Sequence, residues 1–287
     1  MCGTRKSNLV AKITVLVVIF CCSISAQAKY GGGTGEPNDP YLIYDANQMN
    51  DIGADSNDWD KHFRLMADID LSRYTGTSFN IIGTWQPWRP FTGVFDGNGH
   101  TISNFTYSST GTDNIGLFGF DGGVIKDLGL IDAEVDAGTG DYVGVLVGWK
   151  WGGTITNCYV EGVSISGGDY VGALVGDGFN VTNCYATAIV SGSSYVGGLM
   201  GTGSNIANCY ATGDVSGDYK VGGLMGMGAN IADCYASSTV SGISIIGGLL
   251  GINGHPAVAG TTLTNCYSTG SVTGDSYVGG LVGWDGT

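Results

Sequence analysis

Short apolar runs separated by glycine, asparagine and aspartate recur along the chain from about residue 100 to its end. One run reads Val-Gly-Gly-Leu-Met-Gly at 196–201, and variants of it recur in the neighbouring units. A second pattern places Ile, Val or Leu, any residue, and Asn or Asp before a final, mostly apolar position. Its seven copies end at Phe105, Leu128, Cys158, Cys184, Cys209, Cys234 and Cys266. With a third run after each tyrosine, as at 213–217, every unit predicts three short β-strands separated by turns.

These units have a nearly constant length. Asn-Cys-Tyr or Asp-Cys-Tyr occurs five times, and the successive cysteines are 26, 25, 25 and 32 residues apart. A unit of this size cannot bury its apolar side alone and must stack on its neighbours. Three strands in about 25 residues favour an all-β fold, a right-handed parallel β-helix in which each strand pairs with its equivalents above and below. Hexapeptide coils of left-handed β-helices are too short for this period, and a β-propeller blade is nearly twice as long.

The repeat does not begin at once. Residues 29–90 are predicted to form an N-terminal cap with irregular first coils, and residues 91–287 the repeats. Within the cap, Asp45 is placed to cap a short helix that carries Ala46, Met49 and Ile52 on one face, and strands are expected at 41–43 and 63–71. The final segment 282–287 parallels 147–149, where the next unit follows, so we expect the sequence to be truncated at its C-terminus.

The first 28 residues have the form of an export signal. Arg5, Lys6 and Lys12 precede the apolar run 13–22, and Ala26 and Ala28 suit cleavage after residue 28. This predicts a secreted or cell-surface protein with no transmembrane segment in the mature chain, because the apolar run is short for a bilayer span.

Composition excludes several classes of protein. The chain has 11 basic and 25 acidic residues, a net charge of −14, and this acidity disfavours nucleic acid and polyanionic partners. Only 13% of residues are charged and 43% are hydrophobic, so the chain is expected to fold despite its 52 glycines.

The repeated cysteines do not form metal or disulfide patterns. They lack paired Cys-x-x-Cys spacing, and in-register strands hold equivalent side chains about 4.8 Å apart, too far for a relaxed disulfide. Because Phe105 and Leu128 occupy the same position of the repeat, the cysteines are predicted to be small interior hydrophobes. We expect five free thiols in the mature chain.

Two columns of polar residues follow from the stacking. Asparagine or aspartate before each cysteine is expected to form a structural ladder at a corner. Tyrosines give the candidate binding surface, since exposed aromatic ladders hold sugar rings or proteins. The predicted binding residues are Tyr159, Tyr185, Tyr210, Tyr235 and Tyr267, with a further column at Tyr142, Tyr170, Tyr195 and Tyr277; stacking of the rings on each other explains both columns equally well.

No catalytic constellation is found. The three histidines, at 62, 100 and 255, form no zinc motif, and beyond Tyr142 the only basic residues are Lys150 and Lys220. Parallel β-helix lyases and hydrolases need basic residues or clustered aspartates on one face. We therefore predict no catalytic residues, no metal and no cofactor. The alternative is a carbohydrate-active enzyme whose active groups lie in the N-terminal region or in missing sequence.

The run at 196–201 and its variants resemble the GLUG motif of exported bacterial proteins, and the segments 40–43, 63–71 and 91–100 resemble the lead-in of such proteins. This resemblance implies an extracellular β-helical stalk or adhesin-like surface, similar to regions of large bacterial adhesins and to the noncatalytic part of immunoglobulin-cleaving peptidases. The implied function is a non-catalytic structural or adhesive module that contacts an extracellular glycan or protein, joined to the remaining coils of a longer parent chain.

Overall fold

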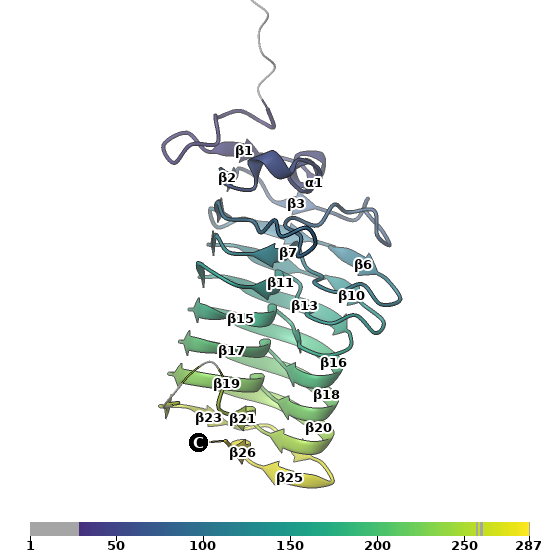
Figure 1. Cartoon of the computed structure of the whole chain (residues 1–287), viewed down its shortest axis with the longest axis vertical. Helices are drawn as coiled ribbons and strands as arrows, with labels where there is room; N and C mark the ends of the chain where they lie inside the picture. Colours follow the sequence, from purple (N-terminus) through teal and green to yellow (C-terminus); the bar gives the residue numbers. More distant parts are fainter. Residues whose placement is uncertain (1–28, 257, 259–260, 287) are drawn as a thin grey trace, which may run out of the picture.

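The stacked units form a single column of β-coils. A computed structural model describes residues 29–256, 258 and 261–286. The column descends from the N-terminal cap to the last strand (Figure 1), and paired strands run parallel in register from coil to coil. The predicted parallel β-helix is confirmed.

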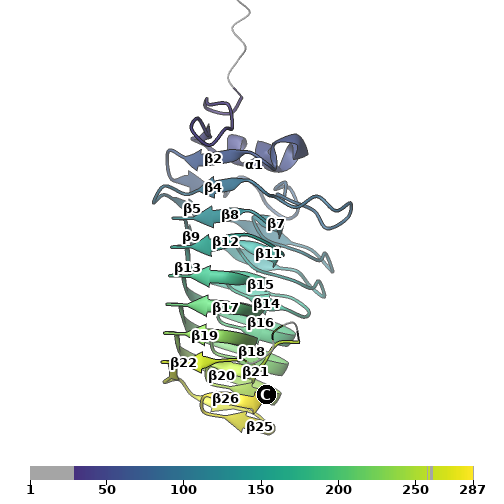
Figure 2. The same ribbon diagram turned by 60° about the vertical axis from the view of Figure 1, so that its left-hand side comes forward.

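Two sheets of 13 strands each run the length of the column (Figure 2). The first sheet contains β1 (Tyr41–Ile43), β2 (His62–Leu65), β4 (Val94–Asp96), β7 (Phe118–Asp121), β8 (Val124–Lys126), β11 (Val147–Lys150), β12 (Thr154–Thr156), β15 (Val175–Thr182), β17 (Met200–Ala207), β19 (Met225–Ala232), β21 (Leu250–Asn253), β22 (Leu263–Thr264) and β26 (Val282–Asp285). The second sheet contains β3 (Ile69–Asp70), β5 (Thr101–Ser103), β6 (Thr106–Ser108), β9 (Gly129–Ile131), β10 (Glu134–Asp136), β13 (Tyr159–Ser166), β14 (Val171–Gly172), β16 (Tyr185–Gly197), β18 (Tyr210–Gly222), β20 (Tyr235–Gly247), β23 (Tyr267–Ser268), β24 (Val272–Thr273) and β25 (Ser276–Gly279).

The regular coils differ from the prediction in one respect. Three short strands are expected in each unit, but β16, β18 and β20 each join two of these runs into one strand of 13 residues. The chain still turns a corner inside them, because Tyr195 has φ of 57° and Lys220 has φ of 59°. Hydrogen bonding between coils continues across the corner, as from Tyr170 N–H to the Ser194 carbonyl (2.9 Å), so the pairing is uninterrupted.

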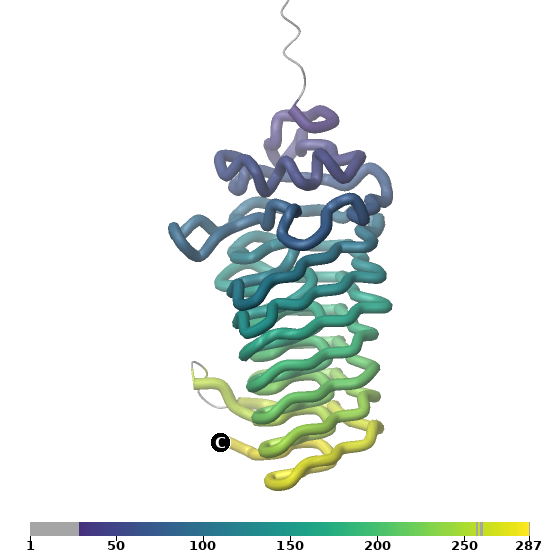
Figure 3. The backbone as a smooth tube through the Cα atoms, turned by 90° about the vertical axis from the view of Figure 1, so that its right-hand side faces the viewer, coloured from purple at the N-terminus to yellow at the C-terminus, as the bar shows by residue number. Residues whose placement is uncertain are grey.

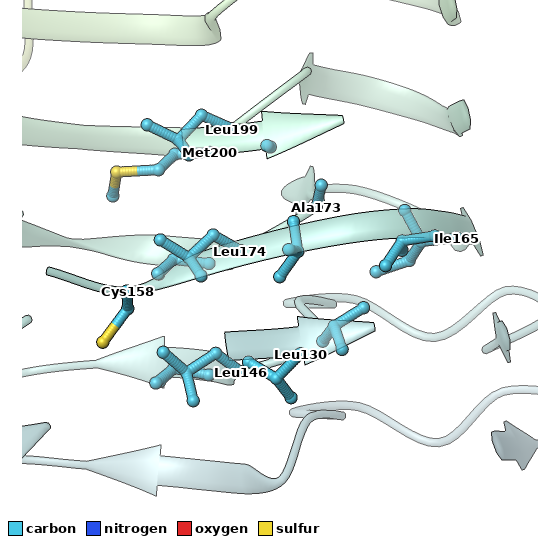
Figure 4. Packing of buried hydrophobic residues seen from close by; sticks show 14 of the residues in the cluster. Leu130, Leu146, Cys158, Ile165, Ala173, Leu174, Leu199 and Met200 are labelled. Carbon is cyan, nitrogen blue, oxygen red and sulfur yellow. The ribbon is translucent and has the colours of Figure 1, made fainter. Parts of the chain in front are cut away.

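Apolar side chains fill the inside of the column. Figure 4 shows part of this packing. Leu130, Leu146, Leu174 and Leu199 are fully buried, and Cys158 packs among the same columns. The predicted interior position of the cysteines is confirmed, since four of the five described cysteines are buried, the fifth is half-buried and all are free thiols: Cys158, Cys184, Cys209, Cys234 and Cys266.

Thiol reactivity tests this packing. Burial raises the pKa of the Cys184 thiol. The hydrogen bond between Cys209 and Cys184 raises the pKa of Cys209 to about 12. Both thiols therefore stay protonated and unreactive at pH 8. A hydrogen bond with Cys234 raises the pKa of Cys266 as well, so accessibility decides the order of reaction. With a thiol reagent and no reductant, the folded chain from residue 29 should react first at half-buried Cys266, and the urea-unfolded chain at all five thiols. A count of one or three in urea would show that disulfides form.

The polar residue before each cysteine forms the expected ladder. Asn157, Asn183 and Asn208 have φ of 54° to 55°, a left-handed conformation that asparagine tolerates. Their amides are linked along the column, from Asn183 Nδ2 to Asn157 Oδ1 and from Asn208 Nδ2 to Asn183 Oδ1, both 3.2 Å. A second ladder, which the sequence interpretation did not single out, joins Asn180, Asn205 and Asn230. Asparagine therefore marks two corners of each regular coil.

The N-terminal cap covers the first coil (Figure 3). Helix α1 (Ala46–Ala54) begins after Asp45, whose carboxylate accepts from two backbone N–H groups, and the 3-10 helix η1 (Ser56–Asp58) follows. The predicted helix, its cap and its buried face are confirmed. The strand expected at 63–71 is split into β2 and β3, because the chain turns from one sheet to the other between Leu65 and Ile69.

The predicted export signal at 1–28 lies outside the described residues. Within the part of the chain that the structure describes, no helix is long and apolar enough to cross a membrane.

Candidate functional site

The five tyrosines predicted to bind form one continuous stack. Adjacent ring centroids are 4.8 to 5.1 Å apart and the ring planes are within 6° of parallel along Tyr159, Tyr185, Tyr210, Tyr235 and Tyr267. Each inner ring is covered on both faces by its neighbours in the stack. At the N-terminal end of the stack, a side chain at Gly129 would collide with the ring of Tyr159. The ladder therefore presents ring edges and hydroxyls rather than ring faces.

One hydroxyl group of this stack donates a hydrogen bond to a glutamate. Tyr185 donates to Glu161 (2.7 Å), and burial together with this hydrogen bond raises the pKa of Tyr185. Stacking of a sugar ring needs an open aromatic face, and the inner tyrosines do not offer one. The binding role predicted for the five tyrosines stays a prediction.

The other tyrosine column is shorter than the sequence suggests. Tyr142, Tyr170 and Tyr195 stack at 4.6 and 4.7 Å, but the next two coils place Lys220 and Ile245 at the same corner. Lys220 Nζ lies 4.1 Å from the Tyr195 ring centre, so the ammonium group of Lys220 takes the place of a further tyrosine ring in this column. Tyr277 stacks separately, on Trp284.

At its N-terminal end this column continues into a group of tryptophans, which we call the tryptophan surface: Trp85, Trp88, Trp149 and Trp151. Trp149 stacks on Tyr142 at 5.5 Å and contacts Trp85 at 4.5 Å between ring centres. Trp85 and Trp88 are 4.7 Å apart, and Trp88 lies 5.5 Å from Trp151. These rings are tilted by 50° to 62°, and Trp88 and Trp151 are 52% and 44% exposed. Trp85 and Trp88 also pack on the buried Phe120, at 5.4 and 4.7 Å between ring centres, so this surface combines exposed indoles with an anchored base.

Two separate segments carry the tryptophan surface. Trp149 and Trp151 flank Lys150 around the end of β11, where alternation turns Lys150 inward. Trp85 and Trp88 lie between β3 and β4, in a hairpin closed by reciprocal backbone hydrogen bonds between Thr84 and Arg89 (2.8 and 2.9 Å). Sequence reasoning missed these residues. The available signal was the spacing Trp-x-x-Trp at 85–88 and Trp-x-Trp at 149–151.

A cleft of about 360 Å³ opens beside Trp85. Its lining includes the polar residues Gln86, Thr112, Asp113 and Asn114. Asn114 Oδ1 is shielded from solvent and has no hydrogen-bond partner among the described residues. An aromatic ring beside hydroxyl, amide and carboxylate groups is the combination that binds a polyhydroxylated ring.

Carboxylates surround this end of the column. Asp141 N–H donates to Asp113 Oδ1 (2.9 Å), and Asp169 N–H donates to Asp141 Oδ1 (2.7 Å), which places the three side by side. Burial and the nearby charges of Asp177 and Asp141 raise the pKa of Tyr142. The local field is negative, as the composition predicts for the whole surface.

The two basic residues beyond Tyr142 each have a partner. Lys150 is fully buried against Asp121, and Lys220 donates to the Tyr195 hydroxyl (2.5 Å). Asp96 contacts Arg64 and Lys126, each at 3.0 Å. Across the described ranges no group of three or more His, Cys, Asp or Glu side chains could hold a metal ion.

Comparison with known proteins identifies the repeat motif. Residues 192–216, one full coil, match the model of the GLUG motif. The chain carries a GLUG motif. The matched coil contains the run at 196–201 that suggested the resemblance, and the same pattern recurs through the GLUG repeats above and below it.

Two relatives match part of the chain. Halomucin of Haloquadratum walsbyi is 36% identical over 132 residues, which cover 45% of this chain and 1% of that protein. A protein of Evansella cellulosilytica, described as a candidate Gly-rich membrane protein, is 35% identical over 170 residues, covering 53% of this chain and 18% of the relative. The chain thus spans only a small part of the length of these relatives.

A solved structure supports the fold. The crystal structure of a candidate immunoglobulin A1 protease from Bacteroides ovatus superposes with a TM-score of 0.65, over 88% of this chain and 87% of the other, at 24% sequence identity. At this identity the likeness supports the β-helical architecture and nothing about activity.

Proposed function

We propose that this chain is an exported, non-catalytic adhesive module whose tryptophan surface binds an extracellular polysaccharide. The GLUG motif and the β-helical neighbour fit an extracellular repeat module. The observation that carries the proposal is the open, tilted arrangement of Trp85, Trp88 and Trp151 beside a cleft lined by polar side chains.

The chemistry of the surface favours a neutral glycan. Apolar C–H faces of a sugar ring pack on indole, while Gln86 and Asp113 line the cleft for its hydroxyl groups. The surrounding carboxylates repel polyuronates and other polyanions. A rigid column is a suitable carrier, because it holds the aromatic rings in fixed positions and little entropy is lost on binding.

Affinity electrophoresis in gels containing a neutral β-glucan or mannan tests the proposal. We expect the chain from residue 29 to be retarded by one of these polymers and to move freely in polygalacturonate. Trp85→Ala combined with Trp88→Ala should weaken binding at least tenfold, about 1.4 kcal/mol, because two exposed indole rings are removed. The matched control is Trp284→Ala, which removes a 50% exposed tryptophan on the last strand and should leave retardation unchanged.

Other outcomes separate the alternatives. Equal retardation of the wild type and the double tryptophan variant would exclude the tryptophan surface as the binding site. If instead the combined Tyr159→Ala, Tyr185→Ala and Tyr210→Ala variant alone loses binding, the tyrosine ladder is the contact surface. Release of sugar fragments by the purified chain would favour the carbohydrate-active enzyme.

A further inference from the structure

One ion pair lies entirely inside the column. Lys150 and Asp121 are both fully buried, and Lys150 Nζ lies 2.5 Å from Asp121 Oδ2. The two residues are register partners on the adjacent strands β11 and β7, so coil stacking itself holds them together. The other buried aspartates of the described chain, Asp58 and Asp96, have partly exposed lysine or arginine partners. Among the ion pairs of the described residues, only this one has both charged groups removed from water.

Backbone groups orient the pair. Gly123 N–H donates to Asp121 Oδ1 (2.9 Å), and the Gly123 carbonyl accepts from Lys150 Nζ (3.0 Å). Phe91, fully buried, pairs with Asp121 from the coil above. On the other side, a Cβ at Gly178 would lie 2.7 Å from Lys150 Cβ, so the next coil closes tightly on the lysine. The amine and the carboxyl group therefore face each other in an enclosed, apolar place.

Burial changes the protonation that such a pair prefers. Removing an ammonium and a carboxylate from water is costly, and transfer of one proton from nitrogen to oxygen removes both charges. Desolvation raises the pKa of Asp121, which favours its protonated form. The product of this transfer is a neutral amine, which is nucleophilic, beside a neutral carboxylic acid, which is electrophilic.

We propose that Lys150 and Asp121 condense to an intramolecular amide bond that joins two successive coils. The lone pair of Lys150 Nζ attacks Asp121 Cγ and forms the N–C bond. Gly123 N–H stabilises the negative charge that develops on Oδ1. A proton passes from nitrogen to Oδ2, the Cγ–Oδ2 bond breaks, and one water molecule leaves. No oxidant, reductant or co-reactant is needed.

The bond would close a loop between residues 29 apart in the sequence, in the part of the column that carries the tryptophan surface. Lys150 stands between Trp149 and Trp151, so the covalent link would fix the strand that presents both rings. A cross-link of this kind also resists forced separation of the coils, which is useful in a module that holds a surface under load.

Mass spectrometry tests the proposal on the folded chain. We expect the intact mass of the wild type, incubated at neutral pH after folding and then denatured, to be lower than the sequence mass by one water molecule. Digestion with a lysine-specific protease should yield a branched peptide that joins the Asp121 and Lys150 segments, with no cleavage after Lys150. Lys150→Arg and Asp121→Ala should each keep the full mass, and so should wild-type chain kept unfolded in urea.

Asp121 is followed by Gly122, and such a pair can also lose water by cyclising to a succinimide. A succinimide would persist in Lys150→Arg, would be opened by hydroxylamine and would leave Lys150 cleavable. An unchanged full mass of the folded wild type, or water loss without a branched peptide, would overturn the proposal and leave Lys150 and Asp121 as an ion pair only. These measurements do not involve glycan, so they stand apart from the proposed function.

Discussion

Replacing Gly223 by alanine should lower the free energy of unfolding by about 3 kcal/mol, the upper part of the range for overpacking a closely packed interior. A Cβ at Gly223 would lie 2.2 Å from the carbonyl oxygen of Gly248 in the next coil and 2.9 Å from Ala236 Cβ. The backbone of one of the coils must move, because neither obstacle is a flexible side-chain end. The parallel hydrogen bonds that join the coils are then strained along the whole strand.

Gly280 supplies the matched control. It occupies the same position of the GLUG run in the last described coil, and a Cβ there meets no atom within 4 Å. Gly280→Ala should therefore change stability by less than about 0.5 kcal/mol. Urea unfolding followed by circular dichroism compares the two variants. Equal midpoints for Gly223→Ala and Gly280→Ala would mean that close coil approach is not the reason for glycine in the motif.

The same geometry explains why the repeat could be read from the sequence. Glycine in the GLUG run is required where the backbone of one coil passes against that of the next, as at Gly197, whose Cβ would lie 2.5 Å from Met225 Cα. Asparagine is favoured where the chain adopts a left-handed corner. Both requirements recur once per coil, so the pattern carries the coil length, the corners and the interior position of the cysteines.

The tryptophan surface could not be found in this way, because periodicity says nothing about it. Trp85 and Trp88 belong to a connection with no repeat register, and they reach Trp149 only through the folded hairpin. The tyrosine ladder has the opposite character. Its spacing is obvious in the sequence, yet the coordinates are needed to see that its rings cover each other's faces.

The Lys150–Asp121 pair could be predicted only in part from the sequence. Aligning the run that contains Phe118 with the run that contains Val147 places Asp121 opposite Lys150, so their contact follows from the repeat. Their burial does not, because a lysine after a tryptophan at the end of a strand reads equally well as a surface residue. In the structure, Lys150 lies on the inward side of β11 and is fully buried.

Phe118→Ala should cost about 3 to 5 kcal/mol of stability, as expected for removing a large aromatic ring from a closed interior. Phe118 is fully buried, and its ring lies 5.0 Å from that of Phe91 and 5.4 Å from that of Phe95. The equivalent residue of the last coil is half-buried Val282, so Val282→Ala, costing about 1 kcal/mol or less, is the control.

The variant should also weaken glycan binding while the chain is still folded. Ile82 pairs with Phe118, and its backbone bonds to Leu117 and Gly119 (3.0 and 2.8 Å) hold the hairpin that carries Trp85 and Trp88. A cavity beneath this pairing lets the hairpin shift, and the tilted rings then lose their fixed positions. Hydrogen exchange should report faster exchange at Ile82 and Gly119 in Phe118→Ala than in Val282→Ala. Unchanged protection there, with unchanged retardation by the glycan, would show that the hairpin is positioned by other contacts.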